Sequence, residues 1–300
     1  MKNQIYSAPI TRNTPAMIGF VLDLSGSMCE EVYYEGCKMT KCVALSTIVN
    51  RTIYEIVSSC NKCSSHYNYF EFMAIGYSEN SIVNLFEDTI GDSSIGNDFY
   101  SVNDIVSASV ENVIQQRKII NSSGENMFAQ YKVPQYIHPT ASGSTPMYKA
   151  LKKAYDLTKF WIDEHSDTRN FPPMIIHITD GESTDAPMSD VVTLSQKIKS
   201  LHTPDGNVLF LNIHVIGSQE ENNAIKFPSH KDELQPLKNA QYLFDMSSIF
   251  PKNMLKMVRE VKNAVDIEEV INSRMMTFNS NIATILEAIN IGTVTLTKNL

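Results

Sequence analysis

The sequence has 300 residues, 43% of them hydrophobic and 19% charged, which is the composition of an ordinary globular protein with a sizeable core. Acidic residues outnumber basic ones by 33 to 25, and the formal net charge is −8. This balance argues against a nucleic-acid partner, because nucleic-acid binding depends on clustered lysine and arginine. No apolar stretch is long enough to span a membrane, and the first residues lack the apolar region of a signal peptide. We therefore expect a cytoplasmic protein with no membrane partner.

The five cysteines are expected to form neither a disulfide framework nor a zinc site. Cys60 and Cys63 have the spacing of half a zinc site, and Cys37 and Cys42 are the candidates for the other half. Apolar residues recur between the two pairs at helical spacing, and a helix of this length would hold the pairs about 27 Å apart. We therefore predict free thiols, which are typical of the cytoplasm.

The first part of the chain predicts three strands and one long helix. Residues 17–22 form a continuous apolar run, typical of a buried parallel strand, and residues 38–60 have the apolar spacing of a helix. Two short strands are predicted at 69–74 and 81–86, with a hairpin turn at 76–80.

Residues 87–140 form a long polar segment that is rich in serine and asparagine. We expect this segment to hold one helix, with Val102, Val106, Val110 and Val113 on one face. Connections of this length without secondary structure are uncommon in compact domains, and they are usually functional or disordered.

The second part of the chain alternates helices and strands. A helix is predicted to begin at Thr145 and Pro146, and two more are predicted at 189–201 and after Pro251. Strands are predicted at 174–178, at 208–216 and, as a short sixth strand, at 241–244. This alternation predicts an α/β fold with a Rossmann-like open, mainly parallel six-stranded sheet and helices on both faces.

We divide the chain into a domain at 1–265, which contains the insertion at 87–140, and a C-terminal extension at 266–300. The extension predicts an amphipathic helix, broken near Gly292 before a β-prone stretch, whose apolar residues are Ile267, Ile271, Phe278, Ile282, Ile285 and Ile289. We favour packing of this helix on the domain, and the alternative is a docking helix for a partner protein.

Three polar clusters occupy positions where a ligand site is expected. Asp23, Ser25 and Ser27 follow the first strand, Thr145 lies where a helix begins, and Asp180 follows the strand at 174–178. The carboxyl ends of parallel strands share one edge of a sheet, so the first and third clusters are expected to lie close together. Their carboxylate and hydroxyl oxygens, without histidine or cysteine, predict a site for Mg²⁺, Mn²⁺ or Ca²⁺ and not for Zn²⁺.

Asp-x-Ser-x-Ser, a later Thr and Thr-Asp-Gly, in this order and setting, resemble the metal-ion-dependent adhesion site of von Willebrand factor A domains. The resemblance implies that Ser25, Ser27 and Thr145 bind a divalent cation directly, while Asp23 and Asp180 bind it through water. It also implies an open coordination position that a carboxylate of a protein partner fills. Neutral hydroxyl ligands suit this role because they leave the cation attractive to an incoming acidic residue.

Each feature of this pattern also has an ordinary structural explanation. Ser25 and Ser27 are typical of turns, Thr145 before a proline is typical of a helix start, and Asp180 before a glycine is typical of a turn. Only their joint occurrence favours the metal site. Glu30 and Glu31, just after the first cluster, are interpreted as a solvated rim that tunes cation affinity.

The remaining histidines are weaker candidates. His177 and His214 lie inside apolar strands and are interpreted as residues of the core or close to it. His138 precedes the second cluster, but a role in supporting the site is not favoured.

The resemblance predicts a cytoplasmic, non-enzymatic protein-binding module that acts as a scaffold or regulator and takes an acidic residue of its partner. It is similar in layout to intracellular bacterial members associated with tellurium resistance and with kinase–phosphatase gene clusters. A magnesium-dependent phosphatase is one alternative, but haloacid-dehalogenase-type enzymes need a second carboxylate where this chain has Ser25. The other alternative is a helper of an ATPase in metal-cofactor insertion. The ATPase would be a separate protein, because this chain has no phosphate-binding Gly-x-x-x-x-Gly-Lys motif.

Overall fold

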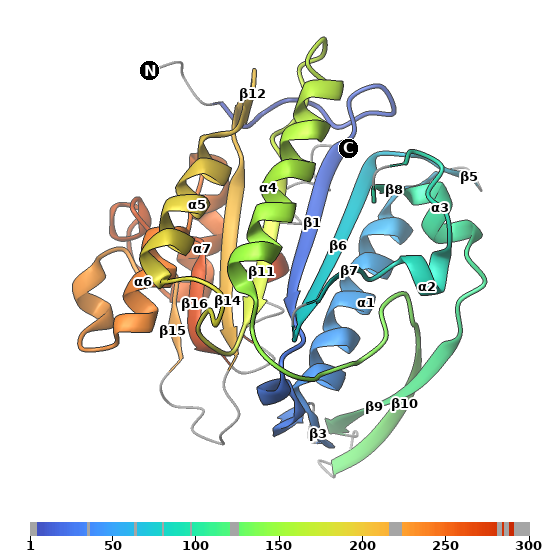
Figure 1. Cartoon of the computed structure of the whole chain (residues 1–300), viewed down its shortest axis with the longest axis horizontal. Helices are drawn as coiled ribbons and strands as arrows, with labels where there is room; N and C mark the ends of the chain where they lie inside the picture. Colours follow the sequence, from blue (N-terminus) through green and yellow to red (C-terminus); the bar gives the residue numbers. More distant parts are fainter. Residues whose placement is uncertain are drawn as a thin grey trace.

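The computed structural model describes residues 5–34, 37–62, 65–79, 81–96, 98–120, 126–215, 224–280, 284 and 288–290. Its centre is an eight-stranded sheet with the order β15-β16-β14-β11-β1-β6-β7, in which β8 also pairs with β6 (Figure 1). The strands are β1 Ala16–Asp23, β6 Phe70–Ser78, β7 Ser81–Asn84, β8 Tyr100–Ser101, β11 Met174–Thr179, β14 Leu209–Val215, β15 Ile225–Lys226 and β16 Met276–Ser280.

The interior of the sheet is parallel and its margins are antiparallel. β1 pairs in parallel with both β6 and β11, β11 pairs in parallel with β14, and β14 with β16. The antiparallel strands β7, β8 and β15 are short and lie toward the margins. The α/β fold with a mainly parallel sheet is thus confirmed, although the sheet has eight strands in the described residues and not six.

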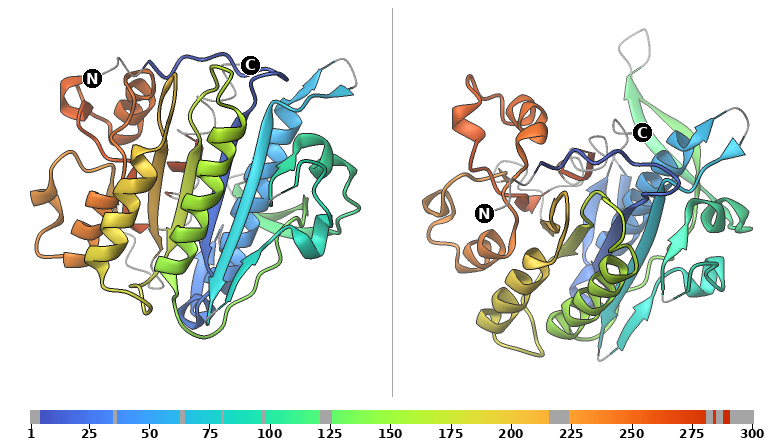
Figure 2. Two further views of the ribbon diagram at one scale, coloured as in Figure 1. Left: turned by 45° about the horizontal axis from the view of Figure 1, so that its top comes forward. Right: turned by 90° about the horizontal axis from the view of Figure 1, so that it is seen from above.

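Helices cover both faces of the sheet (Figure 2). Side chains of α1 and α7 pack in one hydrophobic core, and side chains of α4, α5 and α6 pack in the other. β1 alternates between the two cores, since Ile18 and Phe20 contribute to the first while Met17 and Val21 contribute to the second. The helices are α1 Lys41–Ser59, α2 Glu87–Ile90, α3 Val102–Ser107, α4 Met147–Glu164, α5 Met188–Ser200, α6 Lys238–Met246 and α7 Leu255–Lys262.

Four two-stranded ribbons and several short 3₁₀ turns complete the described structure. The ribbons pair β2 Glu31–Tyr34 with β3 Cys37–Thr40, β4 Asn61–Lys62 with β5 Ser65–His66, β9 Asn112–Ile120 with β10 Asn126–Pro134, and β12 His202–Thr203 with β13 Gly206–Asn207. The 3₁₀ turns include Gly26–Cys29, Lys231–Leu234, Lys252–Met254 and Glu268–Val270. None of the described helices combines the length and apolarity required to cross a membrane.

The segment 87–140 is more regular than the sequence predicted. It contains the helices α2 and α3, the strand β8 and the nine-residue antiparallel ribbon β9–β10. The helix expected there is present as α3, but the segment also holds a second helix and three strands that the sequence did not predict. The helix at Val102 ends at Ser107, and Val113 belongs to β9. Each strand of the ribbon alternates residues between its two faces, but each face carries both polar and apolar residues, so the sequence shows no clear strand pattern.

Two further predictions of secondary structure are wrong. Residues 241–244 belong to the helix α6, whose buried Ala240, Leu243 and Phe244 have helical spacing. A run of four residues is too short to distinguish a strand from a helix by pattern. Phe278 lies in β16, which joins the central sheet beside β14, so the predicted amphipathic helix does not extend through this part of 266–300.

The strand order creates a reversal point between β1 and β11. The chain leaves β1 through α1 to reach β6 on one side, whereas β11 lies on the other side and leads to β14. In open α/β sheets, ligands bind outside the carboxyl ends of the strands at such a point. Asp23 is the last residue of β1 and Thr179 is the last residue of β11, so both lie at this crevice.

Candidate metal centre

Asp23 is a fully buried carboxylate at the reversal point of the sheet. Its Oδ1 accepts a hydrogen bond from the backbone N–H of Ser25 at 2.9 Å, and its Oδ2 accepts one from the Thr179 hydroxyl at 2.7 Å. Burial raises the pKa of Asp23 even though hydrogen bonds from Ser25 and Thr179 lower it, and the nearby Asp180 charge raises it further. The negative charge of Asp23 is therefore incompletely compensated by the protein itself.

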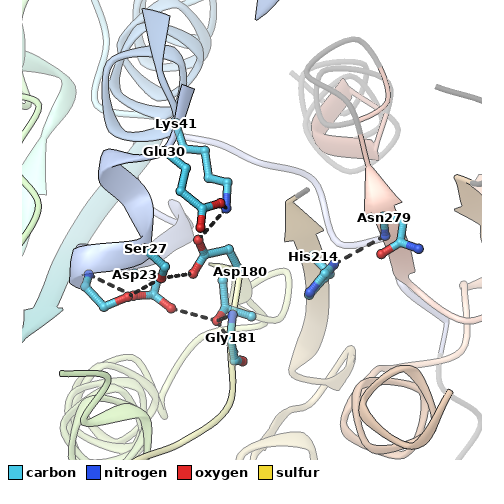
Figure 3. A network of polar contacts seen from close by, with 10 residues as sticks. Asp23, Ser27, Glu30, Lys41, Asp180, Gly181, His214 and Asn279 are labelled. Atoms are coloured by element: carbon cyan, nitrogen blue, oxygen red, sulfur yellow. Dashed lines mark hydrogen bonds and ion pairs between the residues drawn. The ribbon is translucent and has the colours of Figure 1, made fainter. Parts of the chain in front are cut away.

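Ser25, Ser27 and Asp180 complete a hydrogen-bonded cluster with Asp23 (Figure 3). The Ser27 hydroxyl donates to Asp180 Oδ1 at 2.7 Å, and the Ser25 and Ser27 hydroxyl oxygens lie 3.1 Å apart. The structure thus brings together side chains that are more than 150 positions apart in the chain. We call Asp23, Ser25, Ser27 and Asp180 the oxygen cluster.

The loop that precedes α4 is fastened to the loop after β1. The Gly26 N–H donates to the Gly143 carbonyl at 2.9 Å, and the Ser142 N–H donates to the Leu24 carbonyl at 2.8 Å. Gly143 has φ +65°, and a Cβ at this position would lie 2.9 Å from Glu79 Cα. Glycine is required here, because other residues rarely adopt this backbone conformation and the added atom has no space.

Thr145 lies in that same loop, with little exposed surface. Its backbone N–H donates to the Thr184 hydroxyl at 3.0 Å, and its carbonyl accepts from the Thr184 N–H at 2.9 Å. Its own hydroxyl makes no hydrogen bond to any residue that the structure describes. Thr145 is therefore beside the oxygen cluster in the fold but outside its hydrogen bonds, and its hydroxyl is available to a ligand.

Lys41 is a residue of this centre that the sequence analysis missed. Its Nζ donates to Asp180 Oδ2 at 2.8 Å and to Glu30 Oε2 at 2.7 Å. The β2–β3 hairpin lies between Glu30 and Lys41 and closes with a hydrogen bond from the Lys41 N–H to the Glu30 carbonyl at 2.9 Å. One signal was present in the sequence, since Lys41 shares the buried face of α1 with Leu45 and Ile48.

A buried row of polar side chains runs away from the oxygen cluster. Tyr77 Oη lies 2.9 Å from His177 Nε2, and His177 Nδ1 lies 2.9 Å from Asn212 Oδ1. Asn212 in turn donates from Nδ2 to Ser247 Oγ at 2.9 Å, which leaves its Oδ1 to accept from His177. Burial lowers the pKa of His177 to about 4, so this histidine is neutral and donates from Nδ1.

His177 is a residue of the core, as predicted. His214 stacks on Phe278 with ring centroids 4.2 Å apart, and its Nδ1 accepts from the Asn279 N–H at 3.3 Å (Figure 3). Burial lowers the pKa of His214 to about 4. His138 is exposed.

The donors of the centre suit a hard cation. Among the described residues, no group of three or more His, Cys, Asp and Glu side chains is arranged to hold a metal ion. The cysteines Cys29, Cys37 and Cys42 are free, the buried Cys60 thiol donates to the Ile56 carbonyl at 3.2 Å, and Cys63 lies outside the described residues. A cation at the reversal point would therefore depend on hydroxyl as well as carboxylate oxygens, a set that fits Mg²⁺, Mn²⁺ or Ca²⁺.

No protein-family model matches the sequence, and no curated protein matches it either. Similarity to solved structures is weak. The von Willebrand factor domain of the type V pili tip protein Mfa5 from Porphyromonas gingivalis has a TM-score of 0.39 and 9% identity over 94% of this chain and 95% of that chain. The PilB minor pilin from Streptococcus sanguinis has a TM-score of 0.46 and 10% identity over 96% of this chain and 62% of that chain.

A structure of three N-terminal domains of Mfa5 has a TM-score of 0.29 and 12% identity over 59% of this chain, and the match spans 23% of that longer chain. Structural similarity at such low TM-scores supports no conclusion about binding or activity. The α/β assignment rests instead on the strand order and strand directions described above.

Proposed function

We propose that this chain is a non-enzymatic protein-binding module of the von Willebrand factor A type, which binds an acidic group of a partner through a divalent cation. The observation that supports this proposal is the oxygen cluster, formed by two loops at the reversal point of the sheet. When bound, Mg²⁺, Mn²⁺ or Ca²⁺ would supply an open coordination position for a carboxylate of the partner.

Two kinds of side chain would hold the cation, hydroxyls directly and carboxylates through water. Ser25, Ser27 and Thr145 would offer neutral hydroxyl oxygens, and Asp23 and Asp180 would act through water. Neutral ligands leave much of the positive charge of the cation uncompensated, which favours an incoming carboxylate. The incompletely compensated charge of the buried Asp23 favours the cation itself.

An enzymatic function has less support. A phosphatase of the haloacid-dehalogenase type needs a carboxylic acid two residues after Asp23, and Ser25 at that position is bonded within the oxygen cluster. We therefore propose a scaffold or regulator, with kinases, phosphatases or ATPases as candidate associates. The free thiols of Cys29, Cys37 and Cys42 support the proposed cytoplasmic location.

Calorimetric titration with Mg²⁺, Mn²⁺ and Zn²⁺ tests the metal site. We expect Mg²⁺ or Mn²⁺ to bind in preference to Zn²⁺, and we expect Asp23→Asn and Thr145→Val to abolish binding while both variants remain folded. Thr193→Val is the matched control, because its hydroxyl lies on the exposed surface of α5. Tighter binding of Zn²⁺ at a site that Asp23→Asn does not affect would contradict the proposal.

Capture of the partner tests the second half of the proposal. Partner protein should be recovered by the wild-type chain with Mg²⁺, and it should be lost with chelator or on Thr145→Val. Retention of the partner in chelator, together with intact metal binding in the titration, would show that the cation does not mediate the contact.

A further inference from the structure

Lys41 has an unusual position for a lysine. It is the first residue of α1, and its side chain is only 5% exposed, although lysine is rarely buried without a partner. A positive charge at the start of a helix also opposes the helix dipole, which favours acidic residues there. Contacts outside α1 must therefore stabilise the ammonium group at this position.

Two carboxylates in different environments supply those contacts (Figure 3). The Lys41 ammonium lies 2.8 Å from Asp180 Oδ2 and 2.7 Å from Glu30 Oε2. The Asp180 side chain is 0% exposed, whereas the Glu30 side chain is 61% exposed. The ammonium thus connects a buried carboxylate of the oxygen cluster with a carboxylate at its solvated rim.

We infer that Lys41 and a divalent cation compete for Asp180, and that Glu30 retains the ammonium when the cation binds. This inference rests on the proposed function. The Asp180 side chain is buried and needs a positive partner, which Lys41 provides at 2.8 Å. A cation held through the same carboxylate is repelled by the ammonium a few ångströms away, so its binding must weaken the pair between Lys41 and Asp180.

The competition predicts that removing the ammonium strengthens metal binding. Titration of the full chain with Mn²⁺ and Mg²⁺ should give about tenfold tighter binding for Lys41→Met than for the wild type. Lys41→Arg keeps the charge and should stay within about threefold of the wild type. Lys38→Met is the matched control, because Lys38 pairs with Glu31 in the neighbouring hairpin and its side chain is 55% exposed.

Thermal melting separates competition from a purely structural role of Lys41. In chelator, Lys41→Met should melt below the wild type, because Asp180 loses its positive partner. Saturating Mn²⁺ should then raise the melting temperature of Lys41→Met by more than that of the wild type. Equal destabilisation with and without Mn²⁺, together with unchanged metal affinity, would overturn the inference.

Glu30→Gln tests the same competition between Lys41 and the cation without altering a buried side chain. This variant provides the test if Lys41→Met does not fold. Without Glu30, the ammonium depends on Asp180 alone, so Mn²⁺ should bind about threefold or more weakly than in the matched charge variant Glu31→Gln. Equal affinities of these two variants would overturn the inference. Absence of metal binding in the wild type would instead refute the proposed function from which the inference starts.

Discussion

His177 shows how burial fixes the charge of a single side chain in this protein. It is fully buried in β11, and its two ring nitrogens are bonded to Tyr77 and Asn212. Burial lowers its pKa from an ordinary value of 6.5 to about 4. The folded protein therefore keeps His177 neutral at pH values where the unfolded chain binds a proton, and this difference links stability to pH.

We predict that His177 makes the protein less stable as the pH falls from 6.5 to about 4. Above pH 6.5, His177 is neutral in both the folded and the unfolded protein, so its contribution to the free energy of unfolding no longer changes with pH. Within the range, unfolding takes up a proton, and the free energy of unfolding falls by as much as about 1.4 kcal/mol per pH unit from this residue. Urea unfolding followed at several pH values should show a shallower dependence for His177→Gln.

His202→Gln is the control for this measurement, because His202 is exposed. It should leave the pH dependence of the wild type unchanged. The same steep dependence in His177→Gln and in the wild type would show that other groups, such as the half-buried His214, account for it.

At the scale of elements, α4 is joined to β6 by one buried polar contact. Trp161 Nε1 donates to Glu71 Oε2 at 2.6 Å, and both side chains lie in or beside the core between α4 and the sheet. Burial raises the pKa of Glu71, which the hydrogen bond from Trp161 partly offsets. The contact thus stabilises a carboxylate that burial alone disfavours.

Trp161→Phe is predicted to lower the free energy of unfolding by about 2 kcal/mol, because Glu71 then lacks its buried donor. The double variant Trp161→Phe/Glu71→Leu should lose less than the sum of the two single variants. Circular dichroism is the suitable probe, since Trp161 is the only tryptophan and its fluorescence disappears with the substitution. Strictly additive losses would show that the hydrogen bond contributes nothing.

We expect the β9–β10 ribbon to be the element that recognises a partner. It lies beside β3 and α1, near the edge of the sheet where β1 ends (Figure 1). The Gln115 side chain donates to the Thr47 hydroxyl of α1 at 3.1 Å, which fixes the inner face of the ribbon. Ile114 and Phe128 belong to the outer face and are 59% and 54% exposed.

We predict that Ile114→Ser/Phe128→Ser weakens capture of the partner while metal binding and the melting temperature stay close to those of the wild type. Exposed apolar side chains on a rigid scaffold commonly mediate binding, and their loss costs little stability. Val265→Ser/Ile271→Ser is the matched control, with exposed fractions of 81% and 46% on a different part of the molecule. Equal capture by both double variants would exclude the ribbon as the recognition surface.

From the polar sequence around 121–126, we also predict that shortening this stretch weakens capture of the partner without abolishing metal binding. Residues 121–125 lie outside the described residues, so this expectation stays a prediction.

At the scale of the whole molecule, we predict that the fold survives removal of the metal. The two hydrophobic cores on either side of the sheet do not depend on the oxygen cluster. A cation at about 100 times its dissociation constant adds about 2.7 kcal/mol, which raises the melting temperature of a protein of this size by roughly 5 °C. Melting curves in chelator and in saturating Mg²⁺ measure this shift. Complete unfolding in chelator would mean that the site is structural.

Local patterns in the sequence specify the strands β1 and β11 and the polar residues that follow them. A continuous apolar run that stops at Asp23 or Asp180 is a local pattern, because a strand buried on both faces needs apolar residues along its whole length. The common direction of parallel strands then places both carboxylates at one edge. The α/β fold and the proximity of Asp23 to Asp180 therefore follow from local patterns.

Long-range contacts, by contrast, select the distant residues that complete the centre and the sheet. The contact of Lys41 with Asp180 depends on the β2–β3 hairpin and on the pairing of β1 with β11, and no local pattern of the chain records it. Met276–Ser280 became a strand because β14 offered an unpaired edge with apolar cores on both sides. The structure of such a short segment depends on long-range strand pairing. Backbone hydrogen bonds and burial then outweigh the weak intrinsic preference of the segment for helix or strand.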